Sequence, residues 1–95
     1  MGDIMNATSE HFDLRWQIDM DLRSLSTWLR QSKVEPKPNQ VTGIVQSLDD
    51  AFAVVGQQSP DIRKHFTESH KEYLRMRESA LPYLTGYQGQ PVNQL

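Results

Sequence analysis

The residues of this chain best suited to metal chemistry are His11, His65 and His70 and the adjacent pair Asp49 and Asp50. His65 and His70 are five positions apart, which does not place them on one helix face, and no HExxH pattern surrounds them. Adjacent helical residues point about 100° apart, so the two aspartates do not converge on one ion. We interpret them as solvent-exposed residues, and we expect no metal site and no cofactor.

Covalent and acid–base catalysis have equally little support. The serines lie in no nucleophile-elbow motif and beside no obvious base. The 95 residues contain no cysteine, which excludes thiolate catalysis, Cys-ligated zinc and disulfides within them. We therefore expect a protein that is not an enzyme.

Two polar residues fall inside an otherwise apolar helical stripe, and they call for an interpretation. His70 is open to two, a pH-sensitive packing position or a boundary residue with one ring edge in solvent, and we favour the boundary residue. Arg77 lies in the same stripe, and we interpret it as a side chain whose stem packs while its charged end reaches water.

Nucleic-acid binding is the alternative function. Phe52, Gly56 and Ile62 have helix-turn-helix spacing, and a basic line follows at Lys64, Lys71 and Arg75. Three features oppose it: Phe52 is larger than the motif prefers, glutamates flank the basic line, and the net charge is −2. We therefore do not expect nucleic acid to be the main partner. The alternative function is a helix-turn-helix-like regulator that binds nucleic acid through the second and third predicted helices.

Apolar spacing predicts three helices that would position these residues. The first runs from about Ser9 to Lys33, and two prolines within 34–39 then stop it. The second runs from about Gln40 to Val55 and ends at Gly56. The third runs from Pro60 to about Leu81, with Ser59 as its cap.

The predicted fold class is all-α: a small antiparallel three-helix bundle with flexible N- and C-terminal tails. We divide the chain into a flexible N-terminus (1–8), a single helical bundle domain (9–84) and a flexible C-terminal tail (85–95). The predicted core takes one apolar stripe from each helix: Leu14, Ile18, Leu22, Leu25, Leu29, Val41, Ile44, Leu48, Phe52, Ile62, Phe66 and Tyr73.

A second stripe distinguishes the first helix from the others. Phe12, Trp16 and Met20 recur at four-residue steps, roughly 160° around the helix from the core stripe. Four structures could cover them: a second copy, another protein, the C-terminal tail folded back, or a skewed bundle. Aromatic residues and methionine are typical of interface cores. We predict that these three residues bind a partner.

These observations predict a non-enzymatic protein–protein interaction module. We expect a small homodimeric adaptor, inhibitor or regulator that occupies a partner surface through its first helix, the partner being a second copy, another protein or both. No run of about 18 apolar residues is present, so we expect no membrane association. We expect a cytoplasmic protein.

Overall fold

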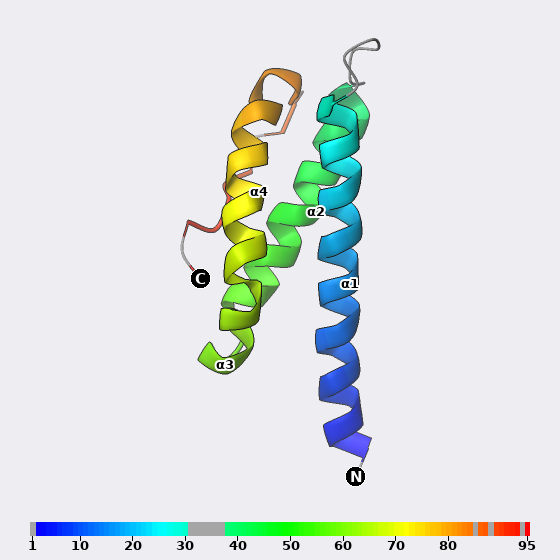
Figure 1. The fold of residues 1–95 in the computed structure, drawn as a ribbon, viewed down its shortest axis with the longest axis vertical. Helices are drawn as coiled ribbons and strands as arrows, with labels where there is room; N and C mark the ends of the chain where they lie inside the picture. Colours follow the sequence, from blue (N-terminus) through cyan, green and yellow to red (C-terminus); the bar gives the residue numbers. More distant parts are fainter. Residues whose placement is uncertain (1, 31–37, 85, 88, 94) are drawn as a thin grey trace.

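The computed structural model describes residues 2–30, 38–84, 86–87, 89–93 and 95, with the side chains of residues 2–12 and 38 left out. The elements are α1 (Gly2–Arg30), α2 (Pro38–Gly56), α3 (Pro60–Arg63), η1 (Lys64–Phe66), α4 (Thr67–Ala80) and η2 (Leu81–Tyr83), where η marks a 3₁₀ turn. α2 runs antiparallel to α1, and α4 runs antiparallel to α2 (Figure 1). The predicted all-α three-helix bundle is therefore confirmed.

The helix ends that lie within the described residues agree with the predicted ones to within two residues except at the start of α1, and the predicted end at Lys33 lies outside them. α1 begins at Gly2, so all but the first of residues 1–8 belong to its backbone; the flexibility expected there stays a prediction. α2 begins at Pro38, in the first turn, where a missing N–H costs no helical hydrogen bond, and it ends at Gly56 as predicted. The predicted stop between the first two helices lies largely in residues 31–37, outside the described residues.

The three predicted stripes meet in one core. Its largest fully buried side chains come from α1, α2, η1 and α4: Tyr73, Phe52, Phe66, Ile18, Leu25, Leu48, Val41, Val45 and Val55. Leu14, Leu29, Ile44 and Ile62, which we also placed in the core, are only partly buried and pack at its margin. The 3.6-residue period therefore identified the buried face of each helix correctly.

The third helix is interrupted, which the sequence did not predict. The 3₁₀ turn η1 separates α3 from α4, and Phe66 leaves helical geometry at φ −108° and ψ 1°. Its ring is fully buried, and Arg15 of α1 covers it with a guanidinium 5.6 Å from the ring centroid. Arg15 also donates a hydrogen bond of 2.9 Å from Nη1 to the His65 carbonyl oxygen. Arg15 thus fixes the break by pairing with a carbonyl beside it.

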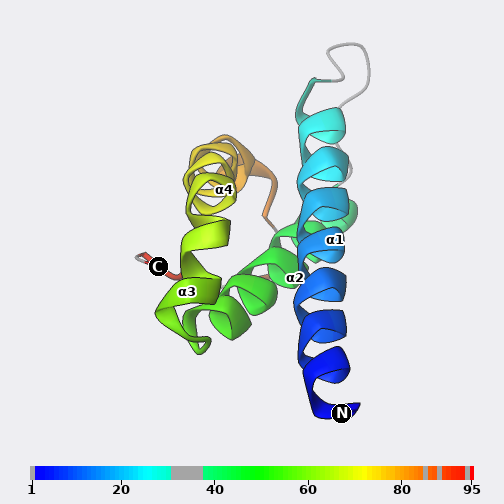
Figure 2. The ribbon, with the colours of Figure 1, turned by 60° about the horizontal axis from the view of Figure 1, so that its bottom comes forward.

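The molecule is elongated because α1 is longer than the helices that pack on it. Its principal extents are 50 × 22 × 21 Å. The N-terminal part of α1 extends past the ends of α2 and α3 in both views (Figures 1 and 2). In the part of the chain that the structure describes, no helix is long and apolar enough to cross a membrane.

Replacing Phe66 with alanine tests whether the interruption is anchored by this ring. We expect Phe66→Ala to lower the free energy of unfolding by about 3–5 kcal/mol, because it leaves a cavity and removes the ring that Arg15 covers. Leu81→Ala is the matched control, since Leu81 is 52% exposed, and should cost less than about 1 kcal/mol. Urea unfolding measures both; equal losses would contradict the anchoring role.

Candidate interaction surface

The outer face of α1 consists of five exposed residues that point away from the core: Asp13, Trp16, Met20, Arg23 and Thr27. Trp16 is 60% exposed and Met20 is 41% exposed, whereas Ile18 between them is fully buried. Trp16 and Met20 are thus on the opposite side of the helix from the core, as the second stripe predicted. The side chain of Phe12, the third predicted partner-binding residue, lies outside the described residues.

Other exposed large apolar side chains do not form a comparable pair. Among the described residues they are Val54 in α2, 45% exposed, and Leu81 in η2. These two belong to different elements, while Trp16 and Met20 are one helical turn apart on α1. The outer face of α1 is therefore the best candidate for a protein interface.

The described residues of the C-terminal segment (84, 86–87, 89–93 and 95) do not cover this face. It ends on the side of α4 away from α1 in both views (Figures 1 and 2). Val92 and Leu95 lie beside Gly56 at the end of α2. If Gly56 carried a Cβ atom, side-chain carbons of both residues would be 3.9 Å from it. A folded-back tail was one of the four coverings we considered, and the segment does fold back, but onto α2 and α4 rather than onto Trp16.

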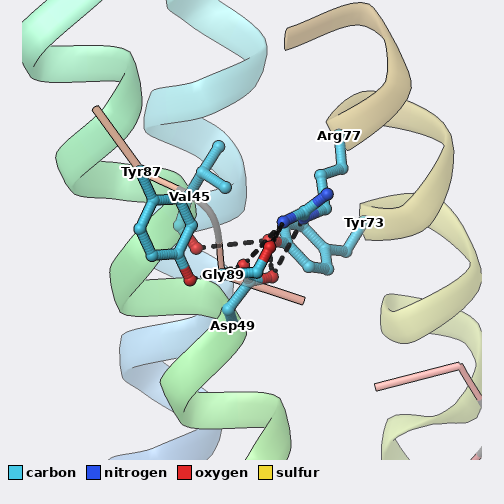
Figure 3. Close-up of polar contacts among 6 residues, drawn as sticks. All are labelled: Val45, Asp49, Tyr73, Arg77, Tyr87 and Gly89. Atoms are coloured by element: carbon cyan, nitrogen blue, oxygen red, sulfur yellow. Dashed lines mark hydrogen bonds and ion pairs between the residues drawn. The ribbon is translucent and has the colours of Figure 1, made fainter. Parts of the chain in front are cut away.

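A buried ion pair holds this segment in place (Figure 3). Arg77 of α4 binds Asp49 of α2 in a bidentate manner, with Nε 3.1 Å from Oδ1 and Nη2 2.9 Å from Oδ2. Tyr73 of α4 donates to Asp49 Oδ1, and its hydroxyl lies 3.2 Å from the Val45 carbonyl oxygen. The C-terminal segment adds the Tyr87 hydroxyl, which donates to Asp49 Oδ2 over 2.7 Å, and the Gly89 carbonyl oxygen, which accepts from Arg77 Nη2 over 2.8 Å.

The interpretation of Asp49 as a solvent-exposed residue is wrong, and so is the interpretation of Arg77 as a side chain whose charged end reaches water. Asp49 is 4% exposed and Arg77 is 8% exposed, because the C-terminal segment and α4 enclose both charges. The sequence did carry a signal: Asp49 is four residues after Val45 and three before Phe52, inside the apolar stripe of its helix. Two opposite charges, each within the apolar stripe of a different helix, indicate a buried pair.

His70 is a second attachment point for the C-terminal segment. Its Nε2 forms a short hydrogen bond with the Val92 carbonyl oxygen, and its ring packs at 59° against Phe52, 5.2 Å between centroids. His70 is 4% exposed, so the alternative of a ring edge in solvent is wrong. We expected the segment that covers the ring to be a flexible tail. It lies against α2 and α4, and its flexibility stays a prediction.

The shared carboxylate changes the acidity of the groups around it. Burial, reinforced by the hydrogen bond to Asp49, raises the pKa of Tyr87 to about 12 and the pKa of Tyr73 still further. The hydrogen bond to Asp49 raises the pKa of Arg77 above its ordinary value. Among the described residues, no buried side-chain nitrogen or oxygen lacks a hydrogen-bond partner. The cluster is therefore saturated internally and directs no free polar group toward a ligand.

The basic line of the alternative function lies at the surface. Lys64 in η1 and Lys71 in α4 are exposed and lie 3.8 Å from Asp61 and Glu68 respectively; Arg75 in α4 is also exposed. The would-be recognition helix breaks after the four residues of α3, whereas a helix-turn-helix places a continuous helix in the major groove. Nucleic-acid binding stays a prediction, with this interruption against it.

Comparisons with known proteins add no family to this geometry. No family model, curated protein or solved structure matches the chain. Within the described residues, no group of three or more His, Cys, Asp or Glu side chains is arranged to hold a metal ion. Functional inference therefore rests on the surface and the buried cluster themselves.

Removing the charge of Asp49 tests the buried ion pair. We expect Asp49→Asn to lower the free energy of unfolding by about 3–5 kcal/mol, because it leaves the Arg77 guanidinium buried without a counter-charge. The neighbouring Asp50 is exposed, so Asp50→Asn is a matched control that should change it by less than about 0.5 kcal/mol. Equal effects of the two substitutions in urea unfolding would contradict the pairing.

The raised pKa of Tyr87 predicts loss of stability in alkali. Tyr87 ionises near pH 10 in the unfolded chain and near pH 12 in the folded one, so its stabilising effect is complete below pH 10 and is lost as pH rises toward 12. We expect Tyr87→Phe to flatten the fall in stability over this range. The measurement is urea unfolding at several pH values, and an unchanged slope in the variant would contradict it.

Proposed function

We propose that this protein is a non-enzymatic protein-interaction module that self-associates through the outer face of α1. The observation that carries the proposal is the exposure of Trp16 and Met20 on a helix whose N-terminal part extends beyond the rest of the bundle. Such a projecting helix offers a surface that its own chain leaves open. A small adaptor, inhibitor or regulator would act by occupying a partner surface in this way.

Energetics favour covering these two side chains. Tryptophan and methionine are enriched at interface cores: tryptophan buries a large rigid area, and the flexible methionine side chain adapts to irregular surfaces. Removing both from water would contribute on the order of a few kcal/mol per chain. A chain of 95 residues has limited stability of its own, so a second copy would also add buried area to a small fold.

A second copy is the partner that we favour over a different protein. Every molecule of the protein carries this surface, so a binding partner is always present at the protein's own concentration. A two-fold symmetric dimer needs only one self-complementary patch. A different protein bound at the same face is the other outcome that we predicted from the sequence. The cytoplasmic location likewise remains a proposal that rests on composition.

Trp16→Glu tests the proposal directly. We expect the purified protein to be dimeric by light scattering, and the substitution to raise the dimer Kd by about 100-fold or more, because each interface would gain two buried carboxylates. The helical circular dichroism signal should be unchanged, since Trp16 lies outside the core.

Leu81→Glu provides the matched control, because it adds the same charge at a similarly exposed apolar position on another element. It should leave the dimer intact. A wild-type protein that stays monomeric at high micromolar concentration would rule out self-association. Unfolding by Trp16→Glu would instead place Trp16 in the core and contradict the surface assignment.

A further inference from the structure

The outer face of α1 has a pattern that is symmetric along the helix. Its residues Asp13, Trp16, Met20, Arg23 and Thr27 follow one another at three- and four-residue steps, the spacing of a coiled-coil seam. The two apolar residues are central. Three positions before them is an acid, Asp13, and three positions after them is a base, Arg23.

The two charges that flank the apolar pair are available to a partner. Asp13 and Arg23 are both exposed, and neither takes part in an ion pair between described side chains. Arg23 lies at the rim of a shallow depression between α1 and α4 that includes Asp19 and Glu72, without pairing with either. Asp19 is engaged instead with Arg15, at 3.5 Å.

We propose that two copies pair through this face as an antiparallel, two-fold symmetric dimer. With the axis midway between Trp16 and Met20, each Trp16 packs against Met20 of the second copy. Each Asp13 then faces Arg23 of the second copy. This arrangement rests on the proposed self-association and specifies its register and direction.

Charge complementarity selects the antiparallel arrangement. In a parallel, in-register pair, Asp13 would face Asp13 and Arg23 would face Arg23, so like charges would meet at both ends of the apolar centre. The antiparallel pair replaces both repulsions with attractions. The isologous symmetry follows, because each contact occurs twice.

The projection of α1 favours the same arrangement. An axis on the outer face, level with position 18 along the helix, aligns the backbone from residue 6 to residue 30 with that of the second copy, an overlap of about 36 Å at 1.5 Å per residue. The N-terminal part of α1, which extends past its own α2 and α3, would then lie along the C-terminal half of the second α1. The two bundles would sit on opposite outer sides of the α1 pair, since core and outer face are on opposite sides of the helix.

Disulfide cross-linking between introduced cysteines tests the direction of pairing. The 95 residues contain no cysteine, so only the introduced residues can react. In the full chain, Asp13→Cys and Arg23→Cys are made separately, and each is oxidised alone and in an equal mixture. We expect a disulfide-linked dimer in the mixture only. In the antiparallel pair, identical positions are about 15 Å apart along the helix axis, too far for a disulfide. Leu81→Cys, mixed with each, is the control and should not cross-link.

Charge reversal provides an independent readout. Asp13→Arg alone and Arg23→Asp alone should each raise the dimer Kd by about tenfold, because two attractions become two repulsions. The double variant Asp13→Arg/Arg23→Asp should restore the wild-type Kd, which a merely structural role of either residue would not do. Circular dichroism verifies that each variant keeps its helicity.

The outcomes separate the register from self-association itself. A monomeric wild-type protein would overturn both. A dimer in which Asp13→Cys cross-links alone is parallel, and it would overturn the register but not self-association. A dimer that is sensitive to Trp16→Glu, yet shows neither the mixed cross-link nor rescue by the double variant, would also overturn the proposed register.

Discussion

The arrangement of α2, α4 and the C-terminal segment depends on one buried ion pair, Asp49 with Arg77. Desolvation offsets much of the attraction in such a pair, so its net stabilisation is modest while loss of one partner is costly. Its effect on geometry is stronger. Two parallel N–H···O bonds form at only one separation and register of the helices. The Asp49 carboxylate also accepts hydrogen bonds from Tyr73 and Tyr87, and Arg77 also donates to the Gly89 carbonyl oxygen. The cluster therefore fixes the side of the bundle that faces away from α1.

The two sides of the molecule have opposite character. Around Asp49 every buried polar side-chain group of the described residues is satisfied, and the chain's own terminal segment covers the surface. On the outer face of α1, Trp16 and Met20 are left in contact with water. Among the described residues, the C-terminal segment thus covers one side of the bundle, while the exposed apolar pair lies on the other side, on α1.

The sequence predicted the helices and most of the core, because burial on one helix face leaves a 3.6-residue period that local spacing reveals. It did not predict features that depend on distant partners. The burial of Asp49 and of the charged end of Arg77 was missed, because a charge in an apolar stripe is explained only by its counter-charge on another helix. The break at Phe66 is fixed by Arg15, fifty positions away from the carbonyl that it binds. The second apolar stripe of α1 could be recognised in the sequence. Whether it is exposed depends on where the C-terminal segment lies, which the sequence did not show.

The way in which the C-terminal segment is attached determines which of its positions tolerate substitution. Arg77 and His70 bind it through main-chain carbonyl oxygens, at Gly89 and Val92, so these two hydrogen bonds do not depend on the side chains at those positions. Selection on the segment would then act chiefly on the residues that pack on the core or need a special backbone: Tyr87, Leu84, Leu95, Gly89, where a Cβ would collide with the Tyr87 ring, and Gly86, whose φ is +70°. Substitutions at the exposed positions Gln90 and Asn93 would meet fewer constraints. Related chains could thus diverge in this region while keeping the same buried cluster.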